Sequence, residues 1–277
     1  MTVSEVFEEG KRILSDSKTE NFSNEARWMF ETAFDVNSQY LFFNSNDEAD
    51  VEKSSAYFEM INRRTEGEPV QYIIGSWDFY GEVFSVGEGV LIPRPETELI
   101  VDFACEYLKG MQNSVVLDLC AGSGCIGLTV AKLNPGSTVY LVEKSPDAMK
   151  YLLKNAERFA LSNVVIISGD IFSGLESFEI PKPDLILSNP PYIESADIET
   201  LQAEVHYEPE MALDGGEDGM IFYNAIAEKW LSCIKTDGII AVEIGEEQGS
   251  DVSEIFSRYY AEVDVIKDFS GNDITYG

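Results

Sequence analysis

The residues with the clearest chemical capability are four in a row, Asn189-Pro190-Pro191-Tyr192, which directly follow the apolar run DLILS. Two prolines cannot continue a sheet, so they fix a rigid corner at the C-terminal edge of the predicted strand, where open α/β sheets bind ligands. The Asn189 side-chain oxygen and the Pro190 carbonyl can each accept one N–H of a planar amide or aromatic amine, and Tyr192 can stack on the flat group. This corner predicts a site that orients a planar nitrogen as a nucleophile, and such alignment can contribute on the order of 7–11 kcal/mol.

A second motif lies where the apolar run SVVLDL continues into CAGSGCIG and a helical pattern. Gly122 and Gly124 lack side chains, so the backbone can turn tightly there and approach a ligand closely. Glu143 ends the next predicted strand, 19 positions after Gly124. In nucleotide-binding α/β folds a carboxylate at that place accepts hydrogen bonds from ribose hydroxyls. The strand, glycine loop, helix, strand and terminal acid together predict a nucleotide-like ligand.

This loop fits two classes of ligand. Gly122, Gly124 and Gly127 satisfy the GxGxxG pattern of dinucleotide-dependent oxidoreductases, whose pyrophosphate binds at a helix N-terminus. The same stretch reads DxxxGxG from Asp118, which resembles motif I of S-adenosylmethionine-dependent methyltransferases, and an acid at the strand end suits a cationic sulfonium ligand. The loop by itself favours methyl transfer only modestly. The Asn-Pro-Pro-Tyr corner, which hydride transfer leaves unexplained, adds weight to methyl transfer.

The composition is that of an acidic globular protein. The 277 residues include 50 Asp+Glu and 19 Lys+Arg, giving a formal charge of −31, so tight binding to naked nucleic acid is not expected. No apolar run reaches the roughly 18 residues of a membrane span, and the N-terminus shows no secretion signal. Four cysteines without CxxC pairs and a single histidine, His206, predict a cytoplasmic protein without a metal site. Nothing in the sequence indicates an obligate dimer, so we expect a monomer.

The periodicity changes twice along the chain. Residues 1–70 show helical spacing and no strand-like alternation, which predicts a small helical domain. Residues 71–92 are rich in aromatic and β-branched residues and glycine, typical of a hairpin linker. From residue 93 to 277 short apolar runs alternate with amphipathic segments, as in an α/β domain with a parallel, Rossmann-like sheet. The runs are SVVLDL, TVYLVE, NVVIIS, DLILSN and GIIAVEI, and two short strands are expected to close the sheet within VDVIKDFSGNDITY.

Several further segments resemble one family, the HemK/PrmC protein-glutamine methyltransferases that modify peptide-chain release factors. They are GEPVQYIIGSWDFYG, LIPRPETE, DLCAGSGCIG, VEKSPDA, SNPPYI, YEPEMALDGGEDG and VEIGEEQG, in this order. The resemblance implies a seven-stranded class I methyltransferase domain behind a helical domain, the latter suspected of contacting the release factor. It also implies methyl transfer from S-adenosylmethionine to the glutamine amide of the GGQ motif.

The resemblance also implies the roles of individual residues. Asn189, Pro190, Pro191 and Tyr192 would bind the substrate glutamine, with Asn189, Pro190 and Tyr192 also catalytic. The residues expected to contact S-adenosylmethionine are Cys120, Ala121, Gly122, Ser123, Gly124, Glu143, Asp170, Ile171 and Asn189. A carboxylate at Asp170 could accept the adenine amino group or simply cap a turn.

Two departures from the family pattern and one ambiguous pair stand out. The glycine loop reads CAGSG where the family usually has GTGSG, and Cys120 is small enough for cofactor binding to persist. The tail DFSGNDITYG lacks the basic residue common near the family's end. Arg94 and Glu96 are expected near the pocket, or paired with each other.

Three other functions remain open. A nucleic-acid amino methyltransferase could use the same Asn-Pro-Pro-Tyr corner, although a charge of −31 makes duplex binding costly. A dinucleotide-dependent oxidoreductase would use only the glycine loop. A module that binds nucleotide without turnover would leave the corner unused.

Overall fold

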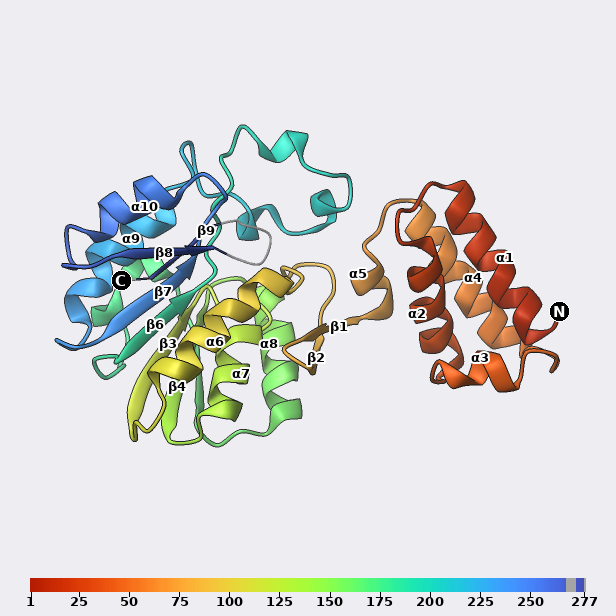
Figure 1. Cartoon of the computed structure of the whole chain (residues 1–277), viewed down its shortest axis with the longest axis horizontal. Helices are drawn as coiled ribbons and strands as arrows, with labels where there is room; N and C mark the ends of the chain where they lie inside the picture. Colours follow the sequence, from red (N-terminus) through yellow and green to blue (C-terminus); the bar gives the residue numbers. More distant parts are fainter. Residues whose placement is uncertain (268–272, 277) are drawn as a thin grey trace. The chain divides into compact units, whose positions relative to one another are not determined.

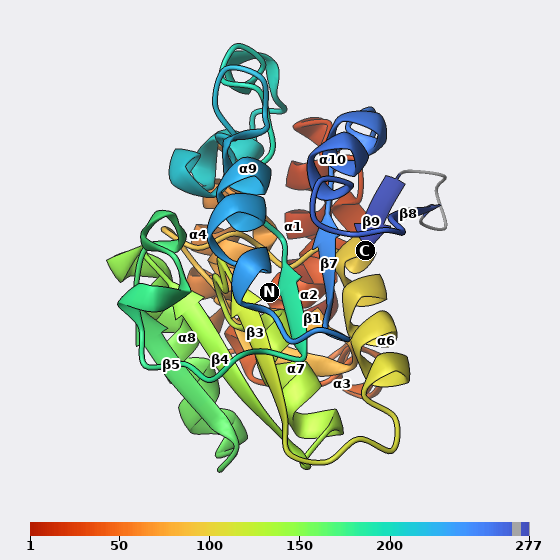
Figure 2. The ribbon, with the colours of Figure 1, turned by 90° about the vertical axis from the view of Figure 1, so that its left-hand side faces the viewer.

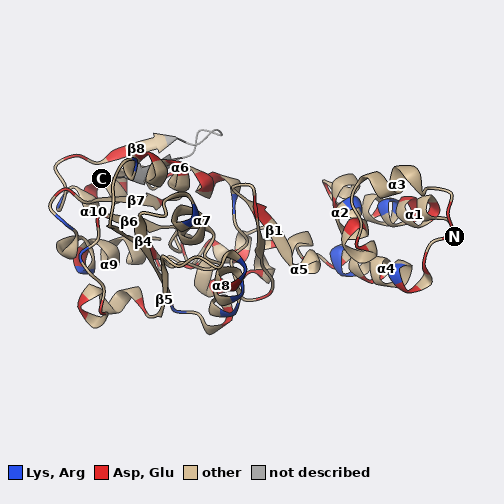
Figure 3. Cartoon of the chain, turned by 90° about the horizontal axis from the view of Figure 1, so that it is seen from below, with Lys and Arg blue, Asp and Glu red and all other residues tan. Residues whose placement is uncertain are grey.

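The computed structural model describes residues 1–267 and 273–276, and the chain forms two compact units (Figure 1). The helical unit comprises Met1–Ser76 together with a separate short segment, Gln202–Tyr207. The sheet unit comprises Trp77–Leu201 and Glu208–Gly277. Acidic residues occur throughout both units, whereas Lys and Arg are scattered among them (Figure 3). None of the helices in the described part of the chain is long and apolar enough to cross a membrane.

The helical unit is built from amphipathic helices around one apolar core. The helices are α1 (Val3–Asp16), α2 (Phe22–Phe34), α3 (Gln39–Phe43), α4 (Val51–Thr65) and α5 (Val70–Ile74). Thr2 starts α1 with a capping box, in which its hydroxyl accepts from the Glu5 N–H while the Glu5 carboxylate accepts from the Thr2 N–H. In the core, Phe30 stacks on Phe34 and meets Tyr57 edge-on.

Arg64, near the end of α4, is a buried cation in the helical unit. Its guanidinium donates to Glu25 of α2 at 2.6 Å and also pairs with Glu204 of the short segment. A buried arginine is tolerated only when its charge is paired. The short segment is therefore joined to the helices by an ion pair, and the Tyr207 hydroxyl adds a hydrogen bond to the Glu66 carbonyl.

The sheet unit contains a seven-stranded sheet in the order β5-β4-β3-β6-β7-β9-β8. Five strands are parallel, and β9 pairs antiparallel with both β7 and β8. The prediction of a Rossmann-like, seven-stranded domain is confirmed, although residues 268–272 of the closing segment lie outside the described residues. The strands are β3 (Ser114–Leu119), β4 (Ser137–Glu143), β5 (Val164–Ser168), β6 (Leu185–Ser188), β7 (Ile239–Glu243), β8 (Asp264–Lys267) and β9 (Asp273–Tyr276).

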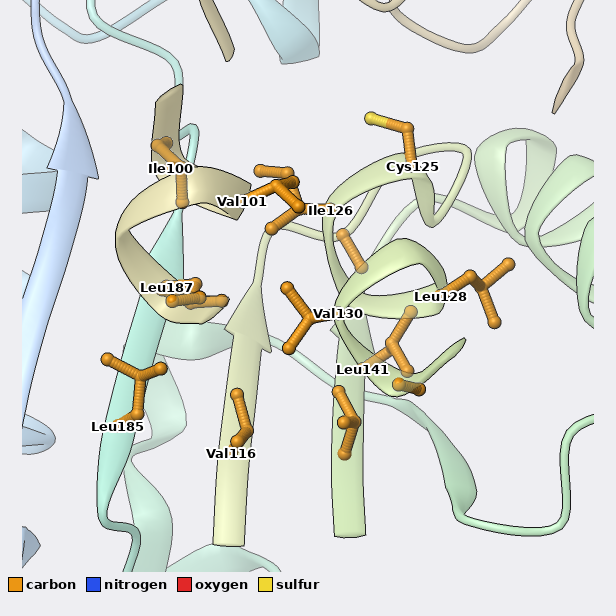
Figure 4. Packing of buried hydrophobic residues seen from close by; sticks show 14 of the residues in the cluster. Ile100, Val101, Val116, Cys125, Ile126, Leu128, Val130, Leu141, Leu185 and Leu187 are labelled. Atoms are coloured by element: carbon orange, nitrogen blue, oxygen red, sulfur yellow. The ribbon is translucent and has the colours of Figure 1, made fainter. Parts of the chain in front are cut away.

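Helices cover both faces of this sheet (Figure 2). One face packs on α6 (Glu98–Tyr107), α7 (Cys125–Leu133) and α8 (Pro146–Phe159), and the other on α9 (Ile221–Lys229) and α10 (Gly249–Phe256). Side chains of α6 and α7 meet strand residues such as Val116, Leu141 and Leu187 in the first of these layers (Figure 4). Strands apolar on both sides explain why the sequence shows continuous apolar runs instead of alternation.

The predicted linker contains more than a hairpin. Its first residues form the short helix α5, and the hairpin itself is β1 (Ser76–Phe79) paired with β2 (Glu82–Ser85). Phe79 and Phe84 of the two strands are buried together in the core of the sheet unit. The hairpin is thus packed into the sheet unit by its aromatic side chains.

Candidate active site

A pocket of the sheet unit opens at the C-terminal ends of β3, β4, β5 and β6, where open α/β sheets bind ligands. Most of the residues predicted for the cofactor line it. They are Cys120, Ala121, Gly122, Ser123, Glu143, Asp170, Ile171 and Asn189. Pro191 also lines the pocket, whereas Gly124, Pro190 and Tyr192 are not among the lining residues.

The glycine loop turns through three residues with positive φ: Cys120 at 60°, Gly122 at 57° and Gly124 at 81°. Glycine adopts this conformation without strain, whereas a side chain at such a position costs on the order of 1–2 kcal/mol. Cys120 therefore occupies a backbone position that glycine would adopt without strain. Gly124 also needs its missing side chain, because a Cβ there would lie 2.4 Å from Leu152 Cδ1.

Glu143 stands at the end of β4 and faces the glycine loop. Its two carboxylate oxygens accept hydrogen bonds from the Gly122 N–H at 2.7 Å and from the Ser145 N–H at 2.6 Å. Burial raises the pKa of Glu143, and these hydrogen bonds partly offset that effect. The carboxylate is held in one orientation at the pocket wall, and its remaining lone pairs can accept ligand hydroxyls.

The carboxylate of Asp118, by contrast, is not among the residues that line the pocket. The side chain is fully buried, and its Oδ2 accepts from the Gly127 N–H at 2.8 Å, in the first turn of α7. A Cβ on Gly127 would lie 2.7 Å from that oxygen, so the third glycine of the GxGxxG pattern permits this contact. The third glycine of the pattern thus serves helix–strand packing, a role that it would have with either class of ligand. The expectation that the Asp118 carboxylate suits a cationic ligand is not supported, because this side chain is buried and does not line the pocket.

Asp170 and Ile171 follow β5 at the next strand end. The Asp170 carboxylate accepts from the Phe172 N–H at 3.0 Å and pairs with Lys144 at 2.9 Å. Burial raises its pKa, but the hydrogen bonds from Lys144 and Phe172 outweigh that effect and lower the pKa overall. Asp170 thus caps a turn and lines the pocket at once.

Asn189 and Tyr192 of the proline corner are joined to two side chains that sequence reasoning missed. Asn189 Nδ2 donates to Thr97 Oγ1 at 3.1 Å, and the Thr97 hydroxyl donates to Glu243 Oε2 at 2.5 Å. The Tyr192 hydroxyl lies 3.4 Å from Glu243 Oε1. Burial raises the pKa of Glu243 to about 7, opposed by the hydrogen bond from Thr97. An acid at the end of a strand, as at Glu143, was the signal that could have singled out Glu243.

Arg94 lines the pocket, as one of the two expectations had it, whereas Glu96 does not, and the expected pairing of Arg94 with Glu96 is wrong. Its guanidinium binds Glu208, whose buried carboxylate also accepts from the Ile92 N–H at 2.9 Å. Glu208 therefore fastens the segment before α6 to the segment that follows residue 207. Pocket-lining residues adjoin both contacts, namely Pro93 on one side and Pro209 on the other.

The glycines of the DGGEDG stretch let that segment return beside the proline corner. Gly215 donates its N–H to the Ile193 carbonyl, and a Cβ on Gly215 would lie 2.7 Å from the Tyr192 Cα. A Cβ on Gly219, whose φ is 71°, would meet the Tyr192 carbonyl oxygen at 2.6 Å. The Tyr192 carbonyl itself accepts from Gln248 Nε2 at 2.7 Å. The backbone of the corner is thus fixed from two sides.

Comparison with known proteins agrees with this fold. Residues 5–75 match the family described as PrmC N-terminal domain, and residues 98–221 match the methyltransferase small domain. A solved methyltransferase structure from Pyrococcus furiosus is similar in fold, with a TM-score of 0.52 and 20% identity over 72% of this chain and 88% of that one.

Two curated relatives are similar over most of their length. A release factor glutamine methyltransferase of Thermodesulfovibrio yellowstonii is 39% identical over 83% of both chains. Another, of Geobacter sulfurreducens, is 38% identical over 93% of this chain and 89% of its own. Because these relatives are 39% and 38% identical over 83% and 93% of this chain, the chain belongs to the release factor glutamine methyltransferase family.

Proposed function

We propose that the protein transfers a methyl group from S-adenosylmethionine to the side-chain amide nitrogen of the glutamine in the GGQ motif of release factors. The observation that carries this proposal is that Asn189 lines the same pocket as the glycine loop and Glu143. The curated relatives described above are named for this reaction. The oxidoreductase alternative has no comparable support, because hydride transfer gives no role to the Asn-Pro-Pro-Tyr corner, whose Asn189 and Pro191 line the pocket.

The cofactor pocket fits S-adenosylmethionine by the chemistry of its donors and acceptors. The Glu143 carboxylate would accept from the ribose hydroxyls, and Asp170 and Ile171 would border the adenine. The glycine loop would approach the cofactor through the residues that line the pocket, Cys120–Ser123. When bound, the sulfonium supplies an electrophilic methyl group with a neutral thioether as leaving group. The glycine loop and strand ends then fix where that methyl group stands.

At the proline corner, Asn189 Oδ1 and the Pro190 carbonyl would each accept one N–H of the glutamine amide, with Tyr192 beside its plane. Holding both N–H groups turns the nitrogen toward the methyl group and increases its electron density. The N–C bond forms as the S–C bond breaks, and the methylated nitrogen then releases its acidified proton to water. Orientation supplies much of the rate, because an amide nitrogen is a poor nucleophile.

The helical unit is the proposed contact for the rest of the release factor. It exposes Phe42 and Phe43, whose rings meet edge-on at 5.3 Å, and Val51. Exposed aromatic side chains of this size often mark interaction surfaces. Replacing Phe42 and Phe43 with Ser should raise the KM for intact release factor and leave turnover of a short GGQ peptide unchanged. An equal effect on both substrates would remove this role.

Methyl transfer from labelled S-adenosylmethionine to purified release factor tests the activity. Label on the factor, absent from a factor whose GGQ glutamine is replaced with Ala, is the expected result. Duplex DNA in a parallel reaction tests the nucleic-acid alternative. Label on DNA alone would assign the same corner to a base amino group, and bound cofactor without transfer to either substrate would contradict methyl transfer to both.

A further inference from the structure

The shape of the Asn189 side chain does not determine which end of its amide points toward the substrate. Its oxygen and nitrogen ends are almost the same size, so either could point toward the substrate. Only the oxygen can accept an N–H from a glutamine amide, whereas the NH2 end would meet the substrate NH2 donor to donor. Something beyond Asn189 must therefore decide which end is presented.

Thr97 and Glu243 lie where their hydrogen bonds can fix the orientation of the Asn189 amide. The Thr97 hydroxyl has one proton, and it donates that proton to Glu243 Oε2 at 2.5 Å. An ionised carboxylate can only accept, so the Thr97 oxygen is left as an acceptor toward its second neighbour. That neighbour is Asn189 Nδ2, at 3.1 Å.

Both side chains are buried, and Thr97 lines the pocket. Thr97 is 1% exposed and Glu243 is 5% exposed. Glu243 ends β7, which pairs in parallel with β6 in a register that sets Val242 opposite Ser188, directly before Asn189. Thr97 reaches the same place from the 3-10 turn Pro95–Thr97 ahead of α6.

We propose that Glu243 and Thr97 are positioning residues that hold the Asn189 amide with its NH2 inward and its oxygen toward the substrate. In this series of hydrogen bonds Asn189 donates to Thr97, and Thr97 donates to Glu243. Reversing the amide would place the Asn189 oxygen against the Thr97 oxygen, and both atoms would be acceptors. This assignment rests on the proposed function, because it concerns the orientation of the group that accepts the glutamine N–H. It also gives the PRPETE and VEIGEEQG segments a shared task at the site.

The test compares Thr97→Val with Thr97→Ser at about pH 8, above the pKa of Glu243. Valine keeps the shape and removes the hydroxyl, so kcat for methylation of release factor should fall on the order of ten- to a hundredfold, as for other small misplacements of reacting groups. The dissociation constant for S-adenosylmethionine should stay within about twofold, and Thr97→Ser should restore most of kcat. Glu243→Gln should also lower kcat, because its amide can donate to Thr97 and removes the single direction of donation.

Thr129→Val is the matched control. Thr129 is equally buried, on α7, and its hydroxyl has no hydrogen-bond partner in the described structure. Both valine variants should unfold within a few degrees of wild type, and only Thr97→Val should lose kcat. A Thr97→Val enzyme with kcat within about threefold of wild type would overturn the positioning role, as would a loss that serine does not restore. An inactive wild type would instead contradict the proposed function itself.

Discussion

The two units of the molecule differ in how many of their buried carboxylates have a cationic partner. In the helical unit the buried carboxylate of Glu25 is neutralised by the buried guanidinium of Arg64. In the sheet unit the buried carboxylate of Glu208 is also paired with a cation, Arg94. The other three buried carboxylates of this unit accept hydrogen bonds from N–H or hydroxyl groups, and none of the ion pairs among the described residues includes them; they are Asp118, Glu143 and Glu243. Paired buried charge specifies packing, whereas buried acids without a counter-ion are costly and cluster where a site needs them.

The largest effect should come from breaking the neutralised pair. Arg64→Ala leaves Glu25 buried without its cation, so the free energy of unfolding should fall by about 3–5 kcal/mol. Arg63→Ala, its neighbour on α4, removes a half-exposed pair with Glu68 and should cost less than about 1 kcal/mol. Denaturant titrations of the full chain measure both. Equal losses would show that burial does not distinguish the two pairs.

Asp118, one of the buried acids without a counter-ion, should make the free energy of unfolding depend on pH. Burial raises the pKa of Asp118 from 3.8 to about 7, so the folded state holds a proton that the unfolded state has already released. Its stabilising contribution is complete below about pH 4 and is lost as pH rises through 7, on the order of 4 kcal/mol. Asp118→Asn should therefore flatten the fall of unfolding free energy between about pH 4 and pH 8. An unchanged slope would mean that Asp118 stays ionised when folded.

Asn189→Ala tests the proline corner. Losing the acceptor for the substrate N–H should lower kcat on the order of 10²–10³-fold, as loss of one preorganised group does elsewhere. Asn163→Ala is a suitable control, because that amide donates to the Ala131 and Ser137 carbonyls away from the pocket. Single-turnover rates with bound cofactor report the chemical step directly. Near-normal turnover of Asn189→Ala with intact substrate binding would refute the orientation mechanism.

Glu143→Ala should act on the cofactor more than on the chemistry. The Glu143 carboxylate accepts a hydrogen bond from the Gly122 N–H and is proposed to bind the ribose hydroxyls. Without it, the dissociation constant for S-adenosylmethionine should rise on the order of tenfold to a hundredfold. Calorimetric titration with the cofactor measures this, and kcat at saturating cofactor should change little. An unchanged dissociation constant would remove Glu143 from the ribose.

The smallest effect is expected at the Tyr192 hydroxyl. It lies 3.4 Å from Glu243, a long contact, and the proposed role needs the ring. Tyr192→Phe should therefore keep kcat within a few-fold, and Tyr192→Ala should lower it further. Steady-state measurements of kcat compare the two variants. A lower kcat for Tyr192→Phe than for Tyr192→Ala would assign the role in substrate binding to the hydroxyl instead of the ring.

Much of the fold could be predicted because its signals are local. Apolar strands covered on both faces give continuous runs, and Ser145 followed by Pro146 marks the start of α8, where the Ser145 hydroxyl accepts from the Ala148 N–H. Helix α2 lacks such a signal, because its N-cap residue, Asn21, makes no capping hydrogen bond with its side chain. The division into residues 1–70, 71–92 and 93–277 remains a sequence prediction. The compact units also depend on contacts between residues distant in sequence, such as those of Gln202–Tyr207 with the helical unit.

The site was predictable where the backbone forms it and less so where side chains meet across the fold. The glycine loop, Glu143 and Asn189 follow strand ends whose place in a parallel sheet is set by topology. Thr97 and Glu243 lie 146 residues apart and meet only through tertiary packing. Arg94 was assigned the wrong partner for the same reason, since Glu208 is 114 residues away and Glu96 is close in sequence.

The short segment Gln202–Tyr207 gives the helical unit an unusual history during synthesis. The five helices of this unit leave the ribosome early. The segment that contains Glu204, the second partner of Arg64, is translated only after Trp77–Leu201. At about 5–20 residues per second that stretch takes on the order of ten seconds. Throughout this interval Arg64 has Glu25 but lacks Glu204, so the first unit to emerge is completed late in translation.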